Sequence, residues 1–565
     1  MQQPPLANRP VLLAAFLAAA APSLLAYNQP PSPTFLNQAT ALAAWGVFVA
    51  LAAPRFEGAL ASSRALLAAL AILALAALAS TAFGTLPSTL GLSALGLLAA
   101  TAAMVLAGSA ARAGPSAADV LTAFFVAWLV AGLINAGLAM VQVFAPAIAD
   151  GAWIARSSLP GRAVGNLRQP NHLSSLLLWA AIAAVALRAT GRLRAVAAAA
   201  SMALLVFAVV LTASRTGLVS VLLLGAWGLL DRGLPGPARR LLVTAPVFYA
   251  AAWWGMSAWA QASAHTFGGE ARLAETDISS SRFGIWANTL DLIAQQPWTG
   301  VGFGRFNLAW TLTPFPGRPT AFFDHTHDLP LQLLVELGLP LGGAVLAALG
   351  WALWLGWRRS AGDVGARSAA MFVVMMGVHS LLEYPLWYAY FLLPAAWAWG
   401  CALGRPGGPG RRGFSRWPAV VGTAMVLGSA LSMADYQRVV RIFEAAPDAL
   451  PLAQRIADGR RSVLFGHHAD YAAATSGVPQ PDGLQVFDRP LHYLLDTRLM
   501  VAWARALHAA GREDAAREVA ARLREFGPQR APDFFADCAT PASAAASFAC
   551  LPPAHTLSWR GLLTP

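Results

Sequence analysis

The chain has 565 residues, of which 57% are hydrophobic and only 12% are charged, and its mean hydropathy is +0.55. The charged share is about half that of a soluble domain. The composition therefore excludes a soluble enzyme, a disordered scaffold and a small disulfide-rich protein. The net charge is +12 and all 39 basic residues are arginine. In so apolar a chain, this charge is first a signal of membrane topology and only then of an anionic partner.

Apolar runs of about 20 residues, bounded by polar or Pro/Gly-rich breaks, predict about 13 membrane-spanning helices. We expect them at 11–27, 37–53, 65–83, 88–108, 119–147, 171–187, 195–213, 216–230, 241–260, 329–356, 369–383, 388–403 and 418–434. The first is not read as a cleavable signal peptide, because further spans follow it and no clear cleavage site closes it. The sequence thus predicts an all-α polytopic membrane protein, with the spans in a domain at 1–434 and a small helical C-terminal domain at 435–565.

The placement of arginine orients these spans. Clusters fall in alternate connections, which makes those connections cytoplasmic by the positive-inside rule. They are Arg55/Arg64, Arg112, Arg188/Arg192/Arg194, Arg232/Arg239/Arg240, Arg358/Arg359/Arg367 and Arg405/Arg411/Arg412/Arg416. We therefore expect a multi-pass protein of the bacterial inner membrane with a cytoplasmic N-terminus. The connection at 148–170, the large loop at 261–328 and the C-terminal domain are then periplasmic.

The cysteines fit that orientation. Cys538 and Cys550 lie close together in the C-terminal domain, and the periplasm permits disulfides. A bridge between them and two idle thiols are both open. Cys401 lies inside a predicted span, where packing explains it.

Polar residues near bilayer depth are costly and therefore informative. Asn166, Gln169, Asn171 and His172 cluster at the entrance of the sixth span. An amide there can cap the helix by accepting from its free N–H groups. Capping explains one amide and leaves the others for a substrate-facing role.

Two arginines stand apart from the cytoplasmic clusters. Arg215 lies at the tip of the hairpin formed by residues 195–230, and Arg282 precedes an amphipathic run at 283–295 in the large loop. Snorkelling to lipid phosphate is one reading of Arg215. A guanidinium fork at the outer face also suits a phosphate or pyrophosphate ligand, and we predict that role for both arginines.

His325 and His327 lie between two aspartates, with Glu336 on the span that follows. A zinc site would need further ligands that the sequence does not offer, so no metal is expected. A histidine beside carboxylates can instead accept a proton from a hydroxyl group. Glu336 is expected to be buried and to require a partner, for which one of the arginines would serve. A solvated polar loop end does not explain Glu336.

His379 and Glu383 mark an outer turn rich in Trp and Tyr, typical of an interfacial aromatic belt. They are one helical turn apart, so they could pair only with each other or support the site. Taken together, the outer face gathers arginines for a pyrophosphate and histidines for a hydroxyl. That combination suits group transfer from a lipid-linked pyrophosphate donor, with no nucleotide-binding motif present.

With these residues the chain resembles the bacterial O-antigen ligase superfamily, most closely its branch of pilin-glycosylating protein O-oligosaccharyltransferases. The resemblance covers about residues 160–400 and rests on the motifs at 165–172, 214–217, 281–286 with 297–304, 325–338 and 379–390. The C-terminal extension also suits that branch.

The resemblance implies an undecaprenyl-pyrophosphate-linked oligosaccharide as donor and inverting transfer of the glycan en bloc, with no metal or other cofactor. His327 matches the histidine proposed to activate the acceptor, although Asp328 stands where Asn is usual, which would bear on pH dependence. Arg215 and Arg282 match pyrophosphate ligands. Gln169, Asn171 and His172 match donor or acceptor contacts.

The expected partners are that donor, membrane lipids and a pilin-like acceptor protein modified on Ser or Thr, with no nucleic acid. An O-antigen ligase acting on the lipid A core and an O-antigen polymerase are the alternatives of the same class. A glycolipid transporter is the alternative of another class, but the sequence shows neither internal repeats nor polar groups through the membrane depth. The tail of about 130 residues favours a protein acceptor, since it offers a docking surface.

Overall fold

The computed structural model describes residues 9–52, 58–263, 265–270, 278–406, 416–477 and 483–563, and within these ranges it is helical with no strand. Contacts divide the chain into two compact units. The first unit comprises Met1–Leu70, Ala99–Glu275 and Ala348–Met433, and the second comprises Ala71–Leu98, Thr276–Ala347 and Ala434–Pro565. The unit boundaries therefore fall inside long helices as well as between them.

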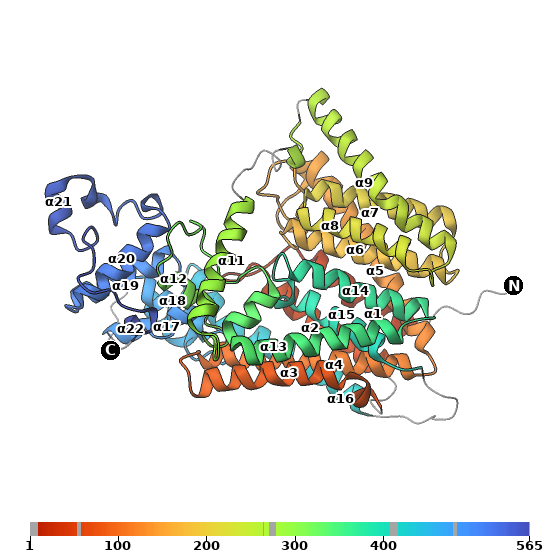
Figure 1. The fold of residues 1–565 in the computed structure, drawn as a ribbon, viewed down its shortest axis with the longest axis horizontal. Helices are drawn as coiled ribbons and strands as arrows, with labels where there is room; N and C mark the ends of the chain where they lie inside the picture. Colours follow the sequence, from red (N-terminus) through yellow and green to blue (C-terminus); the bar gives the residue numbers. More distant parts are fainter. Residues whose placement is uncertain are drawn as a thin grey trace. The chain divides into compact units, whose positions relative to one another are not determined.

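The helices follow one another along the chain as labelled in Figure 1. The long apolar ones are α1 (Arg9–Leu24), α2 (Phe35–Ala52), α3 (Ala59–Ala82), α4 (Ser88–Ala113), α5 (Ala117–Phe144), α6 (Pro170–Ala189), α7 (Ala195–Thr212), α8 (Arg215–Leu230), α9 (Gly236–Ser263), α13 (Leu329–Arg359), α14 (Val364–Ser380), α15 (Ala389–Leu403) and α16 (Trp417–Phe443). The others are α11 (Ile278–Gln295), α12 (Phe306–Leu312), α17 (Leu452–Gly459), α18 (Gly466–Thr475), α19 (Thr497–Ala509), α20 (Glu513–Glu525), α21 (Pro541–Ala546) and α22 (Trp559–Leu563). Short 3₁₀ helices are η1 (Pro146–Ile148), η2 (Pro385–Trp387), η3 (Gly483–Phe487), η4 (Pro490–His492), η5 (Pro528–Arg530) and η6 (Ala536–Ala539).

Each predicted span coincides with one of the long apolar helices. Among the described residues, nine helices are long and apolar enough to cross a membrane, and α1, α8, α14 and α15 are shorter apolar helices. The chain is therefore an all-helical multi-pass membrane protein. The count of 13 crossings stays a prediction.

The first unit packs around α6. Within the part of α6 scored as a span, 89% of the residues are buried, so this helix is surrounded by protein. An aromatic cluster joins it to its neighbours: Trp179 stacks on Phe372 of α14 at 5.1 Å and donates its Nε1–H to the Phe372 carbonyl. Phe124 of α5 stacks on Trp397 of α15 at 4.5 Å. Such aromatic contacts fix the entrance of α6 as a rigid base for the polar residues there.

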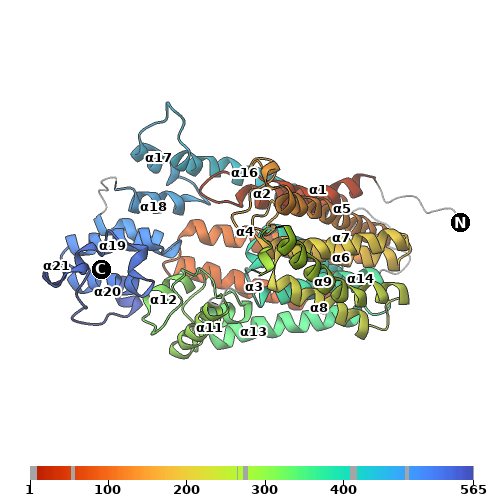
Figure 2. The same cartoon turned by 90° about the horizontal axis from the view of Figure 1, so that it is seen from above.

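In the second unit, a buried arginine fastens the loop after α12 to α20, which lies beside α12 in Figure 2. The Arg318 guanidinium donates to the carbonyls of Trp310 and Thr311 at 2.8 and 3.1 Å and pairs with Glu525 at 3.0 Å. Its cation also lies over the Phe526 ring. Burial lowers the pKa of Arg318 to about 10, against the opposing charge of Glu525, so the side chain stays charged at neutral pH.

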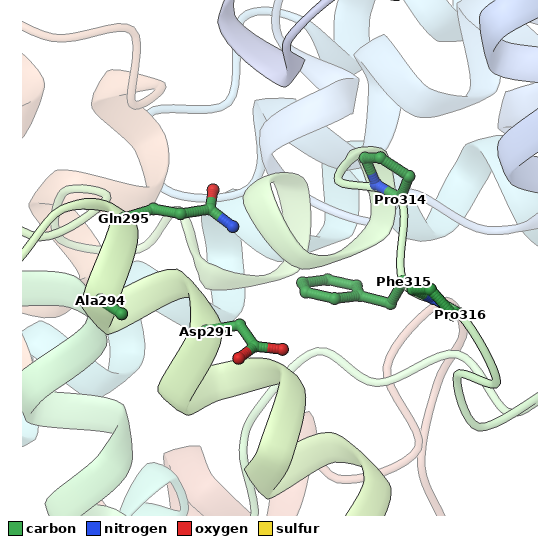
Figure 3. Close-up of a pocket in the computed structure, with 6 residues that line it drawn as sticks. All are labelled: Asp291, Ala294, Gln295, Pro314, Phe315 and Pro316. Carbon is green, nitrogen blue, oxygen red and sulfur yellow. The ribbon is translucent and has the colours of Figure 1, made fainter.

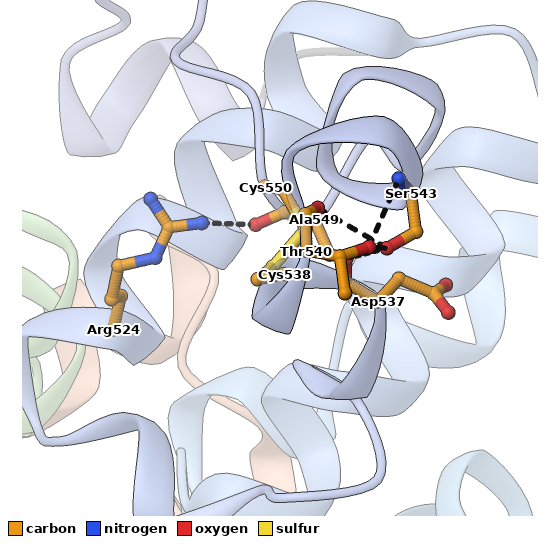
Figure 4. Close-up of a disulfide and its surroundings, with 7 residues drawn as sticks. All are labelled: Arg524, Asp537, Cys538, Thr540, Ser543, Ala549 and Cys550. Atoms are coloured by element: carbon orange, nitrogen blue, oxygen red, sulfur yellow. Dashed lines mark hydrogen bonds between the residues drawn. A yellow bond between two sulfur atoms is a disulfide. The ribbon is translucent and has the colours of Figure 1, made fainter.

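Cys538 and Cys550 form a disulfide, which is one of the two alternatives that the sequence left open (Figure 4). Arg524 of α20 donates to the Ala549 carbonyl beside the bridge. In the same loop, Thr540 is the N-cap of α21, and its side chain forms hydrogen bonds with the N–H and the hydroxyl of Ser543. Cys401 is buried and free, as expected of a residue that packs inside a span.

Candidate functional site

The residues predicted for the site fall into two groups, one in each unit. The first unit holds the polar entrance of α6 together with the starts of α8 and α15. The second unit holds the loop before α13 and the helix α11. Each group is described by itself.

In the first unit, Asn171 is the centre of a hydrogen-bond network between three helices. Its Nδ2 donates to Glu383 Oε1 at 3.0 Å, and its Oδ1 accepts from the Ser214 hydroxyl at 2.6 Å. Gln169 caps α6, because its Oε1 accepts from the His172 backbone N–H at 2.8 Å. Of the two amides considered as caps, Gln169 takes that role and Asn171 is left to link helices.

Asn166 is buried and holds the connection before α6 in place. Its Oδ1 accepts from the Ala155 N–H at 2.9 Å, and its Nδ2 donates to the carbonyls of Leu24 and Trp153. These partners are all backbone groups. Asn166 therefore supports the segment that leads into α6.

Arg215 begins α8 directly after the network. Ser214 is the N-cap of α8, with its Oγ accepting from the Gly217 N–H at 2.9 Å, and Arg215 itself is exposed. The cap and the Asn171 contact use the same Ser214 oxygen. The start of α8, and with it Arg215, is thus tied to the entrance of α6.

His172 and His379 lie in the aromatic pocket around α6. The ring of His172 is 4.6 Å from that of Tyr388, and its Nδ1 is 3.1 Å from the Tyr390 hydroxyl. His379 Nδ1 is 2.8 Å from the Ser175 hydroxyl. The alternative in which His379 and Glu383 only pair with each other is wrong, because both side chains reach residues of α6.

In the second unit, His327 lies in a loop whose shape is fixed by buried polar contacts. Thr326 is fully buried, and its N–H donates to Gln332 Oε1 at 2.9 Å while its hydroxyl donates to the Asp328 carbonyl at 2.7 Å. Gln332 then donates to Glu336 Oε1 at 3.0 Å. His327 adopts φ of 56°, and its ring meets the edge of Phe323 at 5.2 Å.

The expectation of an arginine partner for Glu336 is wrong among the residues that the structure describes. Glu336 accepts from the Gln332 amide and from the Phe306 N–H at 3.3 Å. The Gly304 N–H also bonds to it, and the side chain of His325 acts on it electrostatically. Backbone N–H groups of the glycine-rich turn thus do what an ion pair was expected to do.

The two aspartates that flank His325 and His327 have different contacts. Asp328 Oδ1 accepts from the Leu331 N–H at 2.8 Å and caps α13, and burial raises the pKa of Asp328. Asp324 pairs with His325 at 3.0 Å, and His327 also acts on it electrostatically. Burial raises the pKa of Asp324, but the two histidines lower it by more, so the net direction is down. Asp324 is therefore the carboxylate coupled to both histidines.

Arg282 lies one turn before Trp286 on α11. Trp286 donates its Nε1–H to the Thr326 carbonyl at 3.0 Å, which ties α11 to the loop that carries His327. Residues four apart on a helix share a face, so Arg282 projects from the same side of α11 as this anchor. Arg282 and the His327 loop are brought together by that contact.

Three non-glycine residues have positive φ among the described residues: Arg168, Ala213 and His327, at 57°, 50° and 56°. Arg168 and His327 lie within predicted motifs, and Ala213 lies directly before the motif at 214–217. Non-glycine residues in this conformation cost on the order of 1 kcal/mol or more and cluster at functional sites. The backbone therefore supports the same three segments that the sequence singled out.

A hollow of about 410 Å³ between α11 and the loop after α12 does not involve the predicted residues. Figure 3 shows Asp291 and Gln295 pointing from α11 toward Phe315, with Pro314 and Pro316 beside it. A second hollow of about 290 Å³ shares the same loop and reaches Arg318 and Glu525. Both are open surface features, and neither contains a histidine.

Sequence reasoning missed Gln142, which positions the segment before α6. Its Oε1 accepts from the N–H groups of Val164 and Gly165, and its Nε2 donates to the Ala155 carbonyl at 2.7 Å. The available signal was an amide in the apolar run at 119–147, where Asn135 is the other amide. Ser175 and Tyr390, the partners of the two histidines, carried no such signal because they are ordinary in a span.

Known families match three parts of the chain. Residues 200–346 match the family described as O-Antigen ligase, and residues 163–187 match Protein glycosylation ligase. Residues 369–536 match Virulence factor membrane-bound polymerase, C-terminal. These matches cover both groups of site residues.

Two proteins of Acinetobacter baylyi are similar to the chain. A general O-oligosaccharyltransferase is 28% identical over 260 residues, which are 42% of this chain and 43% of that protein. A ComP-specific O-oligosaccharyltransferase is 28% identical over 273 residues, 47% of each chain. The similarity thus spans less than half the length of either relative. Together with the family matches, this similarity supports a relation to the O-antigen ligase superfamily, near its protein O-oligosaccharyltransferase branch.

Proposed function

We propose that this chain is a glycosyltransferase that moves an oligosaccharide en bloc from undecaprenyl pyrophosphate to a Ser or Thr hydroxyl of a pilin-like protein. The reaction takes place at the periplasmic face of the inner membrane. The observation that carries the proposal is the His327 loop, in which a left-handed histidine is framed by buried Thr326, Gln332 and Glu336. Its support is the match to O-oligosaccharyltransferases.

In this proposal the acceptor oxygen attacks the anomeric carbon of the first sugar. His327 takes the hydroxyl proton, the bond from the anomeric carbon to the phosphate oxygen breaks, and undecaprenyl pyrophosphate leaves with the electron pair. Attack opposite the leaving group inverts the anomeric configuration. Asp324, coupled to His327, stabilises the imidazolium that forms.

Arg215 and Arg282 hold the pyrophosphate and stabilise the charge that develops on it. Arg215 is exposed at the start of α8, and Arg282 is partly exposed on α11, so both can reach a ligand. Asn171, Glu383, His172 and His379 are positioning residues in this scheme, because they set the entrance of α6 and the start of α8.

The test is expression of the chain with a pilin acceptor and an undecaprenyl-linked glycan pool, with the pilin mass as readout. We expect His327→Ala to abolish transfer at unchanged membrane levels. His555→Ala is the control, since His555 lies exposed on the tail. Retained transfer by His327→Ala would remove it as the base.

A ligase acting on the lipid A core is the second candidate, favoured by the match of residues 200–346 to O-Antigen ligase. The same strains distinguish the two. Unmodified pilin together with glycan on the lipid A core would decide for the ligase.

A further inference from the structure

The second unit contains a basic cluster that the proposed reaction does not use. Arg305 begins α12, and the short helices η4 and α22 both pack on α12. They bring His492 and Arg560 to it. Arg560 acts electrostatically on Arg305, and Arg305 acts on His492.

The cluster carries positive charge without compensation. Burial lowers the pKa of Arg305, and the charge of Arg560 lowers it further, while no carboxylate of the described residues acts on it. Burial also lowers the pKa of His492 to about 4, so that histidine is neutral at pH 7. Two guanidinium groups held near each other repel unless an anion lies between them.

Polar atoms in the cluster also lack partners. Arg305 Nε and His492 Nδ1 are buried and have no hydrogen-bond partner among the residues that the structure describes. Buried polar atoms are paired in more than about 90% of cases. A ligand with acceptor oxygens would pair with the Arg305 Nε–H, and with His492 Nδ1 in the tautomer that carries its proton there.

The cluster's own contacts orient the two arginines. Arg305 Nη2 donates to the Thr85 hydroxyl at 2.6 Å, and Arg560 Nη2 donates to Gln296 Oε1 at 2.5 Å. Both acceptors are neutral, so each guanidinium keeps its charge and its other N–H groups for a ligand.

The position of Arg305 indicates which kind of molecule would carry these acceptor oxygens. Thr85 lies in the turn between the ends of α3 and α4, two candidate spans, and a turn between two spans is expected near the boundary between lipid and water. Phe83 in the same turn is 92% exposed, and Trp298, two residues after Gln296, is 76% exposed. Exposed aromatic side chains are typical of that boundary.

We propose that Arg305 and Arg560 bind the phosphate group of an anionic phospholipid headgroup beside the α3–α4 turn. Guanidinium groups suit this ligand because two of their N–H groups match two phosphate oxygens. The lipid would fasten α22, at the end of the described tail, to the turn between two spans. This binding does not depend on glycan transfer.

The experiment is native mass spectrometry of the full chain, delipidated in detergent and titrated with phosphatidylglycerol or with phosphatidylcholine of the same acyl chains. The variant is Arg305→Gln/Arg560→Gln. The control is Arg498→Gln/Arg505→Gln on α19, which removes the same charge from exposed arginines of the same unit. We expect the variant to bind phosphatidylglycerol roughly thirtyfold more weakly, since it loses two basic contacts that contribute about 1 kcal/mol each. The control should match the wild type.

Equal binding of phosphatidylglycerol by the variant and the wild type would overturn the proposal, as would equal binding of the two lipids by the wild type. A third arm measures the melting temperature in inorganic phosphate. Stabilisation by phosphate with no preference for phosphatidylglycerol would assign the site to a free anion and overturn the lipid. Arg560→Gln alone, in the last described helix, repeats the comparison if the double variant melts early.

Discussion

At the scale of single residues, one oxygen of Ser214 has two tasks. It caps α8 through the Gly217 N–H and donates to Asn171, which in turn donates to Glu383. Ser214 and Glu383 are buried, with exposures of 2% and 8%. A change at Asn171 therefore affects both the start of α8 and the outer turn before α15.

We expect Asn171→Ala to lower the free energy of unfolding by about 1–3 kcal/mol, because a buried carboxylate loses a donor. Transfer should fall by roughly tenfold to a hundredfold as Arg215 shifts. Thermal unfolding in detergent and pilin mass measure the two effects. Glu383→Gln keeps an acceptor oxygen, so its cost should be smaller.

Asn171→Ala and Glu383→Ala should be non-additive in a double-mutant cycle, since each of them removes the same contact. Thr122→Ala, at an exposed hydroxyl of α5, is the control. Additive effects would mean that Asn171 and Glu383 do not act through each other.

At the scale of elements, α13 is broken where it supports Glu336. Gly338 has φ of 76° and ψ of 169° inside the helix, and a Cβ there would lie 2.5 Å from the Trp298 carbonyl oxygen. Across this close approach, the N–H groups of Val301 and Gly302 donate to the carbonyls of Val335 and Glu336. The glycine-rich turn and the start of α13 are thus one structural piece.

Gly338→Ala should destabilise the protein by roughly 1–3 kcal/mol, because alanine is strained at this φ and its Cβ meets backbone. Gly343→Ala is the matched control on the same helix, since nothing lies within 4 Å of its Cβ. That change should be neutral or stabilising by up to about 1 kcal/mol. Equal melting temperatures for the two variants would contradict the account.

The sequence predicts the positions of the helices better than the breaks within them and the contacts between segments. Apolar runs predicted each long helix, because a span needs about 20 apolar residues and little else. The break at Gly338 falls inside one predicted span, because the apolar character of a run does not indicate the backbone φ of its residues. The predicted partner of Glu336 is also wrong. A prediction from charged side chains takes no account of backbone donors such as the Gly304 and Phe306 N–H groups. The motif residues were predictable because polar groups are rare in such a chain.

The helix α18 carries a histidine pair that makes the tail sensitive to acid. Burial lowers the pKa of His468 to about 3, and it lowers that of His467 well below its usual value, with His468 adding to the effect. The two rings are 4.4 Å apart, and Tyr493 packs on both. The folded tail therefore holds both histidines neutral.

Below about pH 6.5 the unfolded chain binds protons at these histidines and the folded chain does not. Stability is then full above pH 6.5 and falls as the pH drops toward 3, by at most about 1.4 kcal/mol per pH unit for each histidine. Hydrogen exchange of α18 at pH 7 and pH 5 measures this loss. His468→Phe should reduce the slope, and His508→Gln, at an exposed histidine, should not. A slope unchanged by His468→Phe would exclude the buried histidine as its source.

At the scale of the whole molecule, two independent features bear on which side of the membrane the tail lies. By the positive-inside rule, the arginine clusters predict that the tail lies on the side opposite the connections that carry them. The disulfide between Cys538 and Cys550 needs an oxidising compartment, which the bacterial cytoplasm is not. Neither feature depends on the other, and both favour a periplasmic tail, where the proposed acceptor would be met.

Cysteine labelling in intact cells tests that orientation with the chain's own three cysteines. We expect no reaction of a membrane-impermeant maleimide before reduction, because Cys538 and Cys550 are bridged and Cys401 is buried. A brief treatment with an impermeant phosphine should release two reactive thiols. Cys538→Ser should react at Cys550 without reduction and should destabilise the tail by roughly 3 kcal/mol, the entropy of a loop of this length. Cys401→Ser is the matched control and should label as the wild type does. If Cys550 of the Cys538→Ser variant reacts only after the cells are broken open, the tail is cytoplasmic, and the proposed transfer at the periplasmic face fails with it.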